Sequence, residues 1–111
     1  MGKALLEALQ RLGSEPEAAI EMAAKAIREA AALIPISRFR EDRFSELMFK
    51  LRSLERAFEA SRARLRILAP GVEREQALKD VKADLEEALT LVEQLARVLD
   101  EGKFALPQAR S

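Results

Sequence analysis

The chain has 111 residues, enough for one domain that buries a core of its own without disulfides or metal ions. Almost half of the residues (49%) are hydrophobic and 34% are charged, while Cys, His, Trp and Tyr are absent, which excludes disulfides, thiolate or imidazole metal sites and catalysis by Cys or His. The 19 basic residues balance the 19 acidic ones, so the molecule has no net charge to attract nucleic acid or an acidic membrane.

The N-terminal segment predicts a short helix of about ten residues that ends at Gly13. Ser14 and Glu17 then have the spacing of a capping box, in which Ser14 accepts from the amide of Glu17 at the start of the next helix. No stretch resembles the apolar part of a signal peptide or reaches the roughly 20 apolar residues of a membrane-spanning helix. We therefore expect a cytoplasmic protein that does not contact a membrane.

The second predicted helix is unusually rich in Ala around a spine of Ile20, Ile27 and Ile34, and Pro35 ends it. Small side chains allow a neighbouring helix to approach closely. One polar stripe should face solvent, because its members recur at helical spacing: Glu17, Glu21, Lys25, Arg28 and Glu29.

The third predicted helix, 37–68, carries an unbroken heptad repeat, which is typical of a coiled-coil seam: Phe44, Leu51, Phe58 and Leu65, with Leu47, Leu54, Ser61 and Leu68. The fourth, from Val72 to Gly102, has a matching repeat: Leu78, Leu85, Val92 and Leu99, with Val81, Ala88 and Leu95. Because only a short turn at Pro70-Gly71 joins these helices, they must be antiparallel neighbours.

Six arginines of the third segment are candidates for contact with nucleic acid or with an acidic protein: Arg38, Arg40, Arg43, Arg62, Arg64 and Arg66. The segment 37–68 has nine basic and five acidic residues, a net charge of +4, and 72–103 has the reverse, a net charge of −4. At about 100° per residue, however, the last three arginines fan around the helix. With no Tyr or Trp for base stacking, we favour a structural role for them, with nucleic-acid contact as the alternative.

A second apolar stripe runs along the third helix opposite its heptad seam. We call this stripe the outer face: Phe39, Met48, Phe49, Ser53, Ala60, Ala63 and Ile67. In one interpretation it receives the Ala-rich second helix. In the other it stays open on the monomer and is buried by a second copy or by another helical protein.

Carboxylates are the remaining candidates for chemistry. Asp80, Asp84 and Glu87 share one face of the fourth helix, a spacing that could hold Mg²⁺ and that raises the hypothesis of a helical Mg²⁺-dependent phosphohydrolase. We favour a solvated acidic face. The sequence thus predicts no catalytic residue, no metal site and no cofactor.

Together these segments predict an all-α, antiparallel up-down helical bundle, a single domain over residues 1–106 with Phe104 and Leu106 folded back on it, and a disordered tail over 107–111. We expect three arms, the first broken at Gly13-Ser14, because the first two helices together match the third in length; the alternative is four helices with the short one folded back.

The predicted function is non-catalytic: a small adaptor, chaperone-like or structural subunit that binds a protein partner and forms a homodimer through the outer face. A further alternative is a designed or engineered bundle without natural function, because Cys, His, Trp and Tyr are missing and the helix caps are regular.

Overall fold

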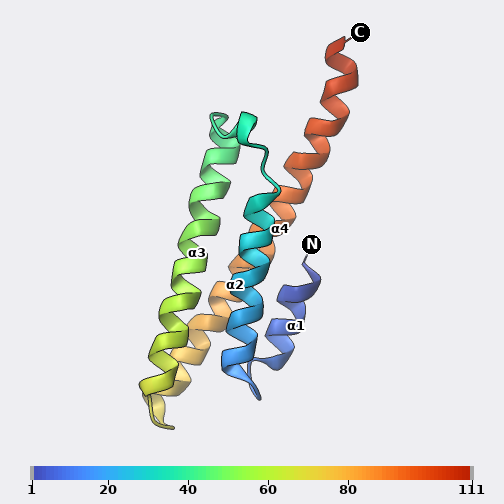
Figure 1. The fold of residues 1–111 in the computed structure, drawn as a ribbon. Coiled ribbons are helices and arrows are strands. Elements are labelled where there is room, and N and C mark those ends of the chain that lie inside the picture. The colour runs from blue at the N-terminus through green and yellow to red at the C-terminus, as the bar shows by residue number, and fades with distance from the viewer. Residues whose placement is uncertain (1, 111) are drawn as a thin grey trace.

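The computed structural model describes the backbone of residues 2–110 and the side chains of residues 2–100. It contains α1 (Lys3–Arg11), α2 (Pro16–Ala32), the 3-10 helix η1 (Ile36–Arg38), α3 (Asp42–Ile67) and α4 (Val72–Arg110), with no strand among the described residues. The prediction of an all-α antiparallel bundle is confirmed (Figure 1). In this described part of the chain, no helix is both long and apolar enough to span a membrane.

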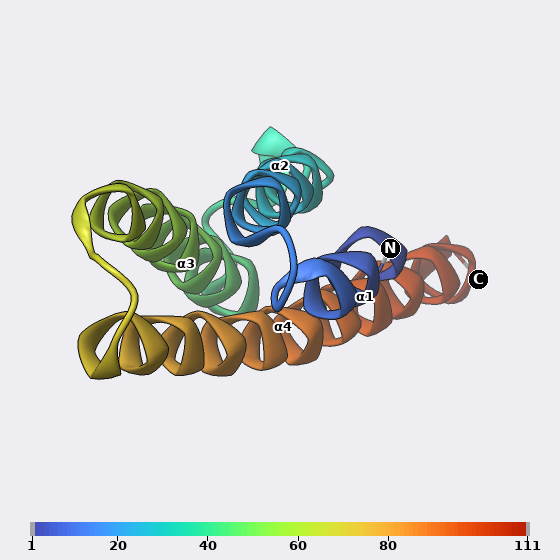
Figure 2. The same ribbon diagram turned by 90° about the horizontal axis from the view of Figure 1, so that it is seen from below.

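Of the two predicted topologies, the four-helix alternative is observed, because α1 folds back beside α2 and also contacts α4 (Figures 1 and 2). The backbone turns after Arg11, whose carbonyl accepts from the amides of Ser14 at 3.1 Å and Glu15 at 2.7 Å. The reason is burial: Leu5 and Ala8 are inaccessible to solvent in this arrangement. In a continuous arm with α2, α1 would lack the contact with its neighbours that buries them.

The turns differ from prediction in their hydrogen bonds. The capping box does not form: the Ser14 hydroxyl donates to the Arg11 carbonyl at 3.5 Å, and α2 begins after Glu15 without a side-chain cap.

Between α3 and α4, Gly71 has a φ of +155°, which side chains disfavour. In the same turn, Arg74 Nη1 donates to the carbonyl of Leu65 at 2.7 Å. A side chain of α4 therefore caps the end of α3.

The fourth helix is longer than predicted, since it continues past Gly102 to Arg110. One glycine inside a helix costs only about 1 kcal/mol relative to Ala, which is too little to end a helix by itself. We predicted that Phe104 and Leu106 fold back on the bundle, but their side chains lie outside the described ones. The disordered tail over 107–111 stays a prediction.

The core is the apolar seam that the heptads predict. Phe44 and Phe58 of α3 are fully buried, as are Val81 and Leu85 of α4, and among the described side chains no polar or charged one is buried. Each large side chain buried in this way contributes roughly 1.5–3 kcal/mol. The helices α2 and α4 occupy two sides of α3 and leave its third side without a neighbouring helix (Figure 2).

Candidate protein interface on the outer face of α3

The outer face is open to solvent along α3. Phe49 is 72% exposed and Ile67 is 84% exposed. Ser53, Ala60 and Ala63 are also exposed, and Met48 is partly buried. Phe39 is exposed as well but lies before α3, because the helix predicted over 37–68 begins only at Asp42, after the separate 3-10 helix Ile36–Arg38. The interpretation in which the Ala-rich second helix covers this stripe is therefore wrong, because α2 packs against another side of α3.

A ladder of ion pairs marks the side of α3 that α2 occupies. Arg62 Nη1 donates to Glu21 Oε1 at 2.8 Å and Arg66 Nε donates to Glu17 Oε1 at 2.7 Å, while at the other end Arg28 of α2 donates to Glu55 at 3.2 Å. Exposed pairs of this kind contribute at most about 1 kcal/mol each, so apolar packing holds α2 in place. The ladder joins α2 to residues that flank the seam and leaves the outer face free.

Two hollows meet at the corner between α2 and α3, where Phe39 and Met48 line both. One, of about 280 Å³, is also lined by Phe44, Ser45 and Phe49. The other, of about 380 Å³, is lined besides by Arg28, Ala31, Ala32, Ile34, Ile36 and Arg52. Phe39 and Phe49 of the outer face thus stand beside concave apolar surface at one end of this face.

Sequence reasoning missed two exposed apolar residues at this corner. Ile36 is 83% exposed, and Leu33 is half-exposed. Leu33 caps the Ala-rich helix one position before the buried Ile34 and outside the seven-residue spacing of the spine. For Ile36, Pro35 is the available signal, because the chain leaves the helix there and the side chains beyond it no longer follow helical spacing.

An ion pair and two cation–π contacts hold the chain at the same corner. Arg38 Nε donates to Glu41 Oε2 at 2.6 Å, which lowers the pKa of the Glu41 carboxyl and raises the pKa of the Arg38 guanidinium. The guanidinium carbons of Arg38 and Arg43 lie 4.7 Å and 5.4 Å from the ring centre of Phe44, within cation–π range. Arg38 therefore lies over the end of the core.

The six candidate arginines do not share a surface. Arg62 and Arg66 pair with carboxylates of α2, and Arg64 lies 3.9 Å from Asp80 of α4. Glu41 engages both Arg38 and Arg43. Of the six, Arg40 alone makes no ion pair with the part of the chain that is described. The structure thus spreads these charges over three directions.

The acidic residues of α4 also make separate contacts. Asp80 accepts a hydrogen bond from Gln76 at 3.1 Å and pairs with Arg64, whereas the Asp84 carboxyl is partly buried. Burial and the neighbouring Glu87 and Asp80 charges raise the pKa of Asp84. Among the described residues, no three acidic side chains are grouped so that they could hold a metal ion.

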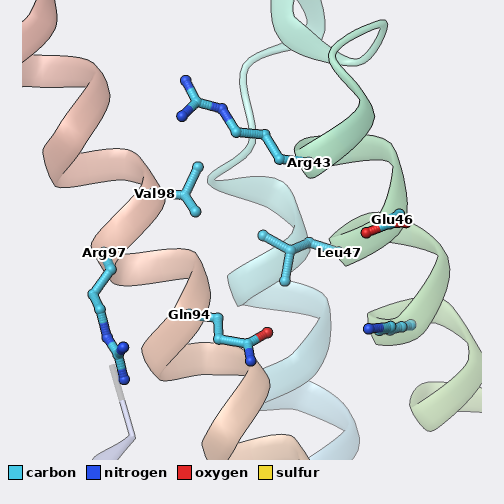
Figure 3. A pocket seen from close by; sticks show the side chains of 7 residues that line it. Arg43, Glu46, Leu47, Gln94, Arg97 and Val98 are labelled. Atoms are coloured by element: carbon cyan, nitrogen blue, oxygen red, sulfur yellow. The ribbon is translucent and has the colours of Figure 1, made fainter.

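A third hollow, of about 290 Å³, opens between α3 and α4 (Figure 3). The ribbons of these two helices diverge towards this end of α3 (Figure 1). Leu47 and Val98 extend into the hollow from the two helices (Figure 3). Charged and polar side chains form its rim: Arg43, Glu46, Lys50, Gln94 and Arg97.

In comparisons with models of protein families, with curated proteins and with solved structures, no match to this chain is found.

Proposed function

We propose that this chain is a non-catalytic protein–protein interaction module, a small adaptor, chaperone-like or structural subunit that associates with itself through the outer face of α3. The observation that carries the proposal is the exposure of Phe49 and Ile67 on a helix whose opposite side is anchored in the core. Isolated apolar residues are common on protein surfaces. Here they lie on one side of one helix, together with the small side chains of Ser53, Ala60 and Ala63.

Energetics favour an interface that buries several of these residues at once. Full burial of one Phe or Ile yields roughly 1.5–3 kcal/mol. Association of two molecules costs an estimated 4–15 kcal/mol in lost freedom of motion. A rigid helical surface supports this balance, because its backbone needs no ordering when the complex forms. Phe49 is the expected anchor, since large aromatic side chains dominate binding energies at interfaces.

The test compares the mass in solution of the native chain with that of Phe49→Glu. We expect a dimer for the native chain and a monomer for Phe49→Glu, because a buried carboxylate without a partner opposes association. Position 49 is exposed, so helical content should not change. The matched control is Ala83→Glu, which places the same charge at an exposed position of α4 and should leave the dimer intact.

A native chain that is monomeric by sedimentation or light scattering would rule out self-association. Equal loss of the dimer in Phe49→Glu and Ala83→Glu would show that the interface is not the outer face of α3.

A further inference from the structure

The solvent-exposed positions opposite the seam of α3 have a spacing that reads the same in both directions. Glu46 and Arg56 complete the series that the outer face forms within α3, and all of its members are exposed. The steps between them alternate between three and four residues, so the series is symmetric about a point between Ser53 and Arg56: Glu46, Phe49, Ser53, Arg56, Ala60 and Ala63.

We propose that two copies of the chain pair through this face, with their α3 helices antiparallel about a two-fold axis between Ser53 and Arg56; the inference rests on the proposed self-association. In this arrangement Phe49 meets Ala60 of the second copy, and Arg56 meets Ser53 of the second copy. Each pair joins a long side chain to a short one, which allows the helices to approach closely without voids. The two-fold axis makes every such contact twice.

The third pair follows the same rule, because Glu46 meets Ala63 of the second copy. In a parallel pairing, by contrast, Phe49 would meet Phe49 and Ala63 would meet Ala63. Large side chains would then hold the helices apart where the small ones leave gaps. The distribution of side-chain size therefore favours the antiparallel pairing.

Charge at the edge of the face favours it as well. Arg52 and Glu59 lie seven residues apart on one edge, so the antiparallel pairing brings Arg52 of each copy near Glu59 of the other. Among the described side chains these groups make long contacts, 4.0 Å from Arg52 to Glu55, 3.6 Å from Arg28 to Glu59 and 3.9 Å from Arg62 to Glu59. The side chains of Arg52 and Glu59 remain about half-exposed or more.

One group opposes the dimer. The two copies of Arg56 come within one helical turn of each other near the axis. Each extends over a Ser53, whose short side chain leaves the guanidinium access to water.

The pairing also covers Ile67. It brings this residue to the N-terminal end of α3 in the second copy, beside the hollow of about 280 Å³ that Phe39, Ser45 and Phe49 help to line. Each end of the face is thus buried by the opposite end of the same face in the second copy. The contact runs the length of the 26-residue helix, about 39 Å.

Single cysteines test the direction of pairing, and the native chain has none that would interfere. In the proposed dimer the two copies of residue 53 are offset by three residues, about 4.5 Å along the axis. Ser53→Cys should therefore form a disulfide-linked dimer under mild oxidation. The two copies of residue 67 are offset by 25 residues, about 37 Å, so Ile67→Cys should not.

A second experiment tests the register. Phe49→Ala leaves two Ala residues facing each other, and Ala60→Phe sets two Phe residues together, so each change should raise the dimer dissociation constant about tenfold or more. The double variant restores a long–short pair in reversed order. Its dissociation constant should return to within about threefold of the native value.

The outcomes separate the two proposals. A native dimer in which both Cys variants cross-link, or in which neither does, would overturn the antiparallel pairing and leave self-association standing. A double variant that dissociates as readily as the single ones would overturn the register. A native chain that is monomeric would contradict the proposed self-association itself.

Discussion

Asp84 is a partly buried carboxylate of α4 whose pKa is raised in the folded bundle. Burial raises its pKa, and the charges of Glu87 and Asp80 add to the effect. Because the folded state then binds the proton more tightly than the unfolded state, the ionised carboxylate destabilises the fold above its folded pKa. This destabilisation decreases as the pH falls below the folded pKa and is absent below the unfolded pKa.

We expect Asp84→Asn to raise the midpoint of thermal unfolding at pH 7, because it removes the partly buried charge. The difference from the native chain should shrink as the pH approaches the ordinary range of an Asp carboxyl, about 4. The control is Asp100→Asn, which removes an exposed carboxylate of α4 that is not among the charges acting on Asp84 and should give no gain. Equal unfolding midpoints of Asp84→Asn and the native chain at pH 7 would contradict this account.

Among the helices, α1 depends most on its neighbours. A nine-residue helix is not stable alone in water, since isolated helices shorter than about 12–15 residues are marginal. It is held by Leu5 and Ala8, which are buried, whereas the adjacent Leu6 is 53% exposed. The stability of α1 therefore comes from its contact with α2 and α4.

Leu5→Ala should lower the free energy of unfolding by about 2–5 kcal/mol, the usual cost of emptying a buried leucine site. Leu6→Ala is the matched control and should change it by no more than about 0.5 kcal/mol. Urea unfolding measures both values. Hydrogen exchange should speed up over Lys3–Arg11 in Leu5→Ala, and similar effects of the two variants would show that α1 is not docked as described.

On the scale of the whole molecule, the described side chains of α3 make more ion pairs with α2 than with α4. The net charges of +4 and −4 on the third and fourth segments suggested that these two helices complement each other. Among the described side chains, Arg64–Asp80 is the ion pair that joins them, at 3.9 Å. The shorter contacts of Arg62 and Arg66 go to α2. Net charge per segment does not reveal which helix lies beside which.

We expect no salt-dependent binding of duplex DNA or of RNA, because the chain is neutral overall and its arginines face three directions. Fluorescence anisotropy of labelled oligonucleotides at low and moderate salt measures this. Binding that weakens steeply with salt would instead support the nucleic-acid alternative, since release of counterions is its signature. Arg40→Gln would then be the first variant to test, because Arg40 makes no ion pair with the described residues.

The outer face could be found from the sequence, because an apolar repeat opposite a heptad seam stands out in a single helix. Phe49 and Ile67 were identified in this way. Ile36 was not, since its exposure depends on the path of the turn after Pro35. The hollow between α3 and α4 was not found either, because it forms where two helices separate.

The sequence by itself determined the helical nature of the chain, the seam between α3 and α4 and the solvent-facing stripe of α2, because periodicity acts locally. Only the tertiary structure decided that α1 folds back and that α2 lies beside the outer face and does not cover it. The physical reason is that an apolar stripe specifies a need for burial without specifying the neighbour that supplies it. That choice depends on how all the helices share the core at once.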